Sequence, residues 1–94
     1  MLRARLDTQI ANELIEDGTL PELMRSVMER LKPEAAYFHA HDGGRACTLV
    51  FDMQDSAQLP SIAEPFFLKL GAEVDVFPAM NVDDMQNGLA ALPT

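Results

Sequence analysis

The stretch AAYFHAHDGGRACTLVFDM, residues 35–53, decides the fold because it is typical of two strands joined by a tight turn. Apolar and polar side chains alternate from Ala35 to His41 and again from Arg45 to Met53, which is the pattern of half-buried strands. The segment Asp42-Gly43-Gly44 between them accepts the positive φ angles of hairpin turns. The sequence therefore predicts an antiparallel hairpin in the middle of the chain.

The alternation also predicts the parity of the turn. A loop with an even number of residues keeps the apolar side chains of both strands on one face, whereas a three-residue loop mixes the two sets. We therefore expect an even loop. One face then carries Ala36, Phe38, Ala40, Cys47, Leu49, Phe51 and Met53. The other face carries Tyr37, His39, His41, Ala46, Thr48, Val50 and Asp52.

The residues before the hairpin predict a strand and two helical segments. Residues 2–7 alternate as a strand, and Thr8 can cap a short helix after it. Thr19 with Glu22 forms a capping-box pattern that restarts the helix, and Pro33 stops it. The apolar residues of this second segment recur at helical spacing: Leu20, Leu23, Met24, Val27, Met28 and Leu31.

A second long helix is predicted after the hairpin. It begins near Asp55 or Ser56, both good caps, and Gly71 is a natural stop. Pro65 lacks the N–H that a helix interior needs, so we expect a kink or a split near Glu64. The apolar face of this helix consists of Leu59, Ile62, Ala63, Phe66, Phe67 and Leu70.

The end of the chain predicts one more strand and a closing helix. The strand covers Glu73 to Phe77 and places Val74 and Val76 on one face. Asn81 and Asp84 have the spacing of a helix cap. The helix that they begin contains Val82, Met85, Leu89 and Leu92.

This order of elements predicts one α+β domain over residues 1–94, a ferredoxin-like βαββαβ sandwich with a C-terminal helix. Right-handed crossovers give a four-stranded antiparallel sheet of order 4-1-3-2. Both long helices cover one face of that sheet, so the other face stays open. The open face carries Arg3, Arg5, Tyr37, His39, Thr48, Val50, Glu73, Asp75 and Phe77. A surface so rich in aromatic and aliphatic groups meets a partner, and we expect a homodimer through it.

The charge of the chain narrows its partners. Seven Lys and Arg stand against fifteen Asp and Glu, and a formal net charge of −8 does not suit binding to phosphate backbones. Apolar runs stay well short of the ~18 residues of a membrane span, and the start lacks the apolar core of a signal peptide. The single Cys47 forms no internal disulfide. We expect a cytoplasmic protein that binds neither nucleic acid nor membranes.

Tyr37 and His39 are the candidate catalytic residues. They share the open face, and Thr48 is expected opposite them, so the three side chains could exchange a proton with a bound molecule. His39 and His41 would need a third ligand to hold a metal, and their spacing is not that of a known metal motif. We therefore expect no metal site. Cys47 is expected on the apolar face, where its thiol stays protonated and inert.

Arg3 and Arg5 have two interpretations. On a central strand they could bind a carboxylate or a phosphate through bidentate hydrogen bonds. The interpretation that we favour is structural, because cross-strand positions on the last strand carry Glu73 and Asp75 and ion pairs would form.

The helix faces are mainly core, but some of their residues could line a cleft between helix and sheet. Met and Phe adapt well to irregular apolar ligands, and a break at Pro65 would open such a cleft. The candidate ligand-binding residues are Met24, Met28, Met53, Phe66 and Phe67.

Two stretches carry a resemblance to a known group. KPEAAYFHAHDGGRACTLVFDM (residues 32–53) and LPSIAEPFFLKLGAEVDVFPAMNVDDMQNGL (residues 59–89) resemble small uncharacterised bacterial proteins, with IAEPFF the most specific part. These proteins are similar in organisation to the dimeric α+β barrel superfamily. The resemblance implies a ferredoxin-like protomer, a face-to-face dimer and, in enzymatic members, a ligand cleft and catalysis without a cofactor.

Three functions remain open at this point. The first is a homodimer that binds a small, largely apolar molecule between sheet and helices. The second is a cofactor-free monooxygenase or isomerase of the dimeric α+β barrel type. The third is a structural or regulatory dimer that binds no ligand. We expect no cofactor in any of the three.

Overall fold

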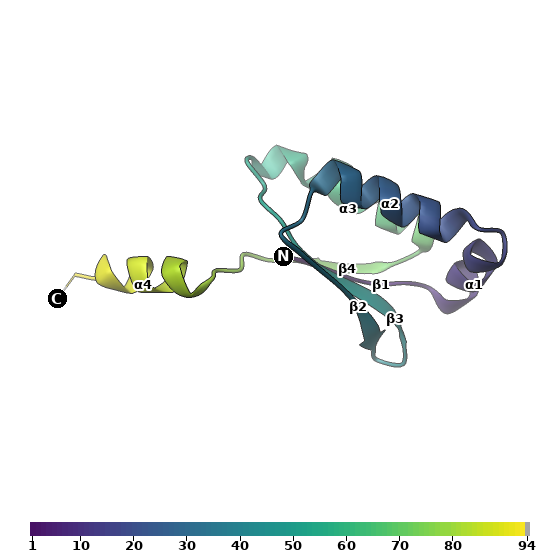
Figure 1. Cartoon of the computed structure of the whole chain (residues 1–94), viewed down its shortest axis with the longest axis horizontal. Coiled ribbons are helices and arrows are strands. Elements are labelled where there is room, and N and C mark those ends of the chain that lie inside the picture. Colours follow the sequence, from purple (N-terminus) through teal and green to yellow (C-terminus); the bar gives the residue numbers. More distant parts are fainter. Residues whose placement is uncertain (94) are drawn as a thin grey trace.

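A computed structural model describes residues 1–93, in which one antiparallel sheet carries two long helices on a single face (Figure 1). The strands are β1 (Leu2–Arg5), β2 (Ala35–His41), β3 (Gly44–Val50) and β4 (Glu73–Val76). The helices are α1 (Thr8–Glu16), α2 (Thr19–Leu31), α3 (Leu59–Leu70) and α4 (Val82–Ala90), and a 3-10 turn, η1 (Ser56–Gln58), precedes α3. The predicted α+β class and the closing helix are confirmed.

The sheet has the strand order β2-β3-β1-β4, and all neighbouring strands are antiparallel. Counted from the β4 edge, this order is 4-1-3-2. The crossovers through α1–α2 and through α3 lie on the same face, so β1 and β3 form the centre of the sheet beneath α2 and α3 (Figure 1).

The hairpin between β2 and β3 has a two-residue turn. Asp42 and Gly43 have φ angles of 49° and 79°, and His41 pairs with Gly44 on either side of them. Two successive positive φ angles are typical of the type I′ turn, whose twist matches that of the strands. The predicted even register of the hairpin is therefore confirmed.

The core lies between the covered face of the sheet and the inner sides of α2 and α3. Its largest fully buried side chains are Leu2, Cys47, Leu49, Phe66 and Leu70. In α2 only Val27 is fully buried, and the rest of the predicted apolar stripe packs partly buried against the core. The predicted α2 stripe therefore faces the sheet. In α3 the buried residues of the predicted stripe are Ile62, Ala63, Phe66 and Leu70, whereas Phe67 is exposed.

The first two helices begin differently from the prediction. Asp7, not Thr8, caps α1, because its carboxylate accepts a hydrogen bond from the N–H of Ile10 at 2.9 Å. The predicted capping box at the start of α2 does not form. Gly18 takes the cap position with a φ of 81°, and Thr19 donates its backbone N–H to Asp17 instead. Hydrogen bonding from the side chain and the backbone N–H of Thr19 lowers the pKa of the Asp17 carboxyl.

Three strands end earlier than predicted. β1 stops at Arg5 instead of Asp7, because Asp7 caps α1. β3 stops at Val50, although the alternation continues to Met53, because β2 begins opposite Val50 and offers no further residue to pair with. β4 stops at Val76 instead of Phe77. Phe77 nevertheless stays bound to the N-terminal residue. Its N–H donates to the Met1 carbonyl oxygen at 3.0 Å, and its own carbonyl oxygen accepts from the Met1 amino group at 2.7 Å.

Pro65 does not split the second long helix. α3 runs through it without interruption from Leu59 to Leu70. The missing N–H removes one helical hydrogen bond, but Ile62, Ala63 and Phe66 on either side are buried against the sheet. Packing of an apolar face contributes more to helix stability in proteins than a single backbone bond. The Asp55 side chain caps η1, not α3 itself.

The helix α4 stands apart from the rest of the molecule. Figure 1 shows it (yellow) beyond the end of the sheet, next to the N-terminus and away from α2 and α3. The principal extents are 57 × 27 × 18 Å, and the radius of gyration is 15.5 Å. A compact domain of this length has a radius of gyration of about 12 Å. The elongation reflects the projecting helix.

Candidate functional site

The open face of the sheet presents two rows of cross-strand neighbours. One row consists of Tyr37, Thr48, Arg3 and Asp75, from β2 to β4. The next consists of His39, Ala46, Arg5 and Glu73. Val50 follows Thr48 by two residues along β3 and so shares this side, and Phe77, directly after the end of β4, continues the alternation from Asp75. We call this surface the open face. It holds the residues that the sequence predicted for it.

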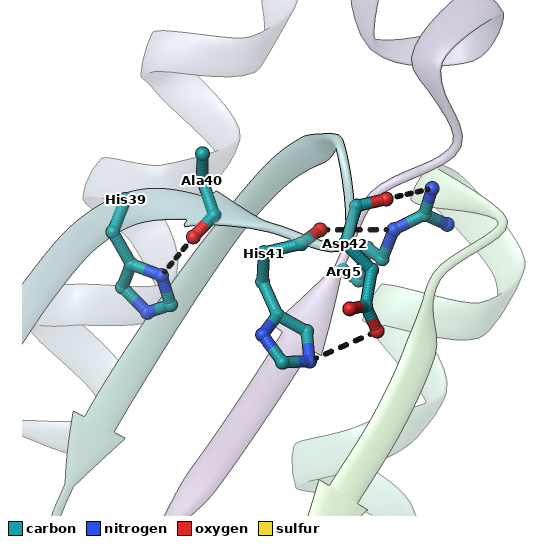
Figure 2. A network of polar contacts seen from close by, with 5 residues as sticks. All are labelled: Arg5, His39, Ala40, His41 and Asp42. Carbon is teal, nitrogen blue, oxygen red and sulfur yellow. Dashed lines mark hydrogen bonds and ion pairs between the residues drawn. The ribbon is translucent and has the colours of Figure 1, made fainter.

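Arg5 is anchored on the hairpin instead of on β4. Its Nε donates to the His41 carbonyl oxygen and its Nη2 to that of Asp42, both at 3.1 Å, as Figure 2 shows. A Cβ on Gly44 would lie 3.1 Å from Arg5 Nε, so a glycine at this position lets the guanidinium approach. The side chain thus holds the turn against the central strand. Sequence reasoning missed this role, for which the signal is Gly44, the glycine directly after the two-residue turn.

Arg3 is less well satisfied. It lies in register between Thr48 and Asp75, and its Nε is buried. Within residues 1–93 this nitrogen has no hydrogen-bond partner, and no carboxylate oxygen of Glu73 or Asp75 lies within 4.0 Å of a guanidinium nitrogen of Arg3 or Arg5. The predicted adjacency of the first and last strands is confirmed, but the predicted ion pairs are not formed within residues 1–93. A buried guanidinium nitrogen without a partner is costly.

The candidate pair Tyr37 and His39 shares the open face but not a pocket. The Nδ1 of His39 lies 3.0 Å from the Ala40 carbonyl oxygen, which only accepts, so Nδ1 carries the proton in the neutral ring (Figure 2). The Nε2 then accepts from the Thr48 hydroxyl at 2.8 Å. Tyr37 is 64% exposed and lines neither of the two hollows that His39 borders. Catalysis by this pair stays a prediction.

The second histidine contacts the turn. His41 Nε2 lies 3.3 Å from the Asp42 carboxylate, an ion pair only when the ring is protonated (Figure 2). In the described part of the chain, no group of three His, Cys, Asp or Glu side chains is arranged to hold a metal ion.

Cys47 lies on the covered face, opposite Phe38, as predicted. Burial raises the pKa of its thiol, because the thiolate would lose its hydration in the core. The group therefore stays protonated near neutral pH and is a poor nucleophile.

An apolar groove opens where β2 extends past α2. Its volume is about 230 Å³. The residues that border it are Leu6, Leu20, Met24, Phe38, His39, Arg45, Ala46 and Cys47. Phe38 is directed to the covered side of the sheet and yet is 61% exposed, because β2 is the edge strand and no helix reaches over it. We call this the β2 groove.

The other predicted ligand-binding residues lie elsewhere. Of the five, only Met24 borders the β2 groove. Phe66 is 1% exposed in the core, and Met28 packs partly buried against it. Phe67 and Met53 are exposed. The structure therefore does not bring these residues into one cleft, and the edge position of Phe38 was the signal that could have located the groove.

No protein-family model, curated protein or solved structure matched the chain in comparisons with known proteins. Over residues 1–93, none of the helices combines the length and the apolar character needed to cross a membrane. The open face and the β2 groove are therefore the features of the structure that bear on function.

Proposed function

We propose that the protein binds a small, largely apolar molecule in the β2 groove. The observation that carries the proposal is the exposed Phe38 beside Leu20 and Met24, which form an apolar surface that no part of residues 1–93 covers. The groove is smaller than the roughly 300 to 1,000 Å³ of drug-sized sites, so the ligand is small. Arg45 at the border favours a ligand with one acidic group.

A thermal-shift and NMR titration with small aromatic and aliphatic carboxylic acids tests this proposal. Binding should shift the amide signals of α2 and of the β2–β3 hairpin. Phe38→Ala should weaken binding about tenfold, the share of one well-placed aromatic contact. Leu68→Ala is the matched control, because Leu68 is 80% exposed on α3 and lies outside the groove. Equal loss in both variants, or shifts confined to other elements, would reject the groove.

We further propose that the open face mediates a homodimer of ferredoxin-like, dimeric α+β barrel type. The exposed Tyr37 and Phe77 support it, because a second copy would remove their apolar surface from water. Sedimentation velocity of the full chain tests the dimer directly. A cytoplasmic location belongs to the same proposal, and a single cysteine without an internal disulfide partner is compatible with it.

A structural or regulatory dimer without a ligand is the second candidate function. The open face favours it independently of the groove, because the charged and aromatic groups there need a partner even if no small molecule binds. A chain that dimerises but binds none of the acids would have this function.

A further inference from the structure

α4 is an amphipathic helix whose apolar stripe touches no core. Every residue from Val82 to Ala90 is exposed. Val82, Met85 and Leu89 recur at spacings of three and four and so share one side of the helix, and Leu89 is 58% exposed. The opposite side is polar, with Asp83, Asp84 and Asn87. An amphipathic helix of this pattern normally packs its apolar side against another apolar surface.

The helix also needs such a surface to persist. Helices shorter than about 12 residues are marginal in water, and α4 has nine. Gly88 inside it lowers its stability further relative to alanine. The capping box of Asn81 and Asp84 offsets only part of this cost. Contacts with something outside its own chain would supply the rest.

The connection to β4 directs α4 away from its own sheet. Met1 and Phe77 exchange two backbone hydrogen bonds, which fix the chain at the end of β4, and Pro78 follows with a restricted φ. Met80 and Asn81 then face Ala35 and the end of β3 across a hollow of about 310 Å³. In one copy, α4 therefore lies beyond the end of the sheet and off both of its faces (Figure 1).

We propose that α4 of one copy lies across the open face of a second copy, and that the exchange is reciprocal. This inference rests on the proposed homodimer and specifies which part of the partner covers the open face. A single two-fold symmetric dimer then covers both unpartnered surfaces of each chain, the apolar stripe of α4 and the open face. Domain swapping, in which two protomers exchange the same element, is a common route to dimers, because no new element is needed to form the interface.

The two surfaces match in size. Nine helical residues span about 13 Å, and the four strands are about 14 Å wide from β2 to β4. The helix can therefore cross the sheet from one edge to the other. Its apolar stripe would meet Tyr37, Val50 and Phe77, which are the apolar groups of the open face.

The charged groups of α4 are compatible with this arrangement. Asp83 and Asp84, the charged groups of the segment from Phe77 to Pro93, lie on the side of α4 opposite to the apolar stripe. With the stripe on the open face of the partner, both carboxylates stay in water and away from the acidic Glu73 and Asp75 of that face.

Charge insertion on the apolar stripe tests the exchange in the full chain. Met85→Asp with Leu89→Asp should raise the dimer dissociation constant at least about 100-fold, since both side chains leave a contact and bring charge into it. The variant keeps its fold, because neither residue touches the core. Asn87→Asp with Ala91→Asp is the matched control, which adds the same charge to the opposite side and should leave the dimer intact.

The outcomes separate the inference from the dimer on which it rests. If the stripe variant dimerises as tightly as the control, α4 is not the contact, although the dimer stands and two open faces pack directly. If the unmodified chain sediments as a monomer at about 100 μM, where even weak dimers form, both the dimer and the exchange are wrong.

A mixed dimer then locates the helix. A nitroxide on the thiol introduced by Met85→Cys in an unlabelled copy should broaden the amide signals of Arg3, Tyr37 and Thr48 in a ¹⁵N-labelled copy. Native Cys47 is buried and does not react with the label. Broadening confined to the β2 groove of the labelled copy would place α4 there instead and overturn the assignment to the open face.

Discussion

Two helices of similar length, α3 and α4, have opposite surroundings. α3 buries Ile62, Ala63, Phe66 and Leu70 against the sheet, although Pro65 interrupts its hydrogen bonds. α4 has the better N-terminus, with a complete capping box, and yet buries none of its residues within the described chain. Local signals thus determine that each segment is helical, whereas the surface that receives its apolar side determines whether it is stable. The comparison makes α4 the part of the molecule that needs a partner.

Core truncation should show the largest difference between the two helices. Phe66→Ala should lower the free energy of unfolding by about 3 to 5 kcal/mol, because the side chain is 1% exposed and its loss leaves a cavity. Leu89→Ala should change the stability of the isolated protomer by less than about 0.5 kcal/mol. Urea denaturation at low protein concentration measures both. A large loss in Leu89→Ala under these conditions would mean that α4 packs on its own chain.

Alanine at two glycines should act with opposite signs. Gly71 ends α3 with a φ of 54°, and a Cβ there would lie 2.9 Å from Ile10 Cδ1. Gly71→Ala should therefore cost about 1 to 2 kcal/mol of stability. A Cβ on Gly88 meets nothing within 4 Å. Gly88→Ala should stabilise the helical state of α4 by about 1 kcal/mol without changing the unfolding of the sheet. Circular dichroism reports the helix content of α4, and denaturation reports the stability of the sheet.

Much of the fold could be predicted because the determining signals are local. The alternation from residue 35 to 50 and the two-residue turn Asp42-Gly43 specify the register of β2 on β3. The contacts of Arg5 could not be predicted, because several acceptors compete for one guanidinium. Arg5 is the cross-strand neighbour of Glu73, but its guanidinium donates to the hairpin carbonyl groups instead, at a close approach that Gly44 allows.

The candidate site was less predictable for the same reason. The apolar stripe of α2 indicates which residues face the sheet, but not that β2 extends beyond the helix and leaves Phe38 uncovered. The capping pattern at Asn81 predicts a helix correctly. Nothing in a capping pattern says where the helix lies, so the projection of α4 is visible only in three dimensions.

Removal of the α4 cap should act on α4 alone. Asn81→Ala eliminates the acceptor that holds the Asp84 N–H at 2.8 Å and should cost about 1 kcal/mol of helix stability. Hydrogen exchange should speed up across α4 and stay unchanged in β1 and β3. If α4 lies on a second copy, the variant also dimerises about fivefold more weakly, because the helix must then be ordered on binding. Faster exchange in the central strands would contradict the independence of α4.

The smallest expected effect concerns the covered face and pH. The pKa of the Cys47 thiol is raised above its ordinary value of 9.0 by burial, so the folded state favours the protonated form. Its contribution to stability is complete below pH 9.0 and is lost as the pH rises through the higher folded value, since the unfolded chain releases its proton first. The free energy of unfolding should therefore fall more steeply from pH 8 to pH 10 in the native chain than in Cys47→Ala. Parallel curves would mean that the thiol is not desolvated, and that the covered face admits water as the open face does.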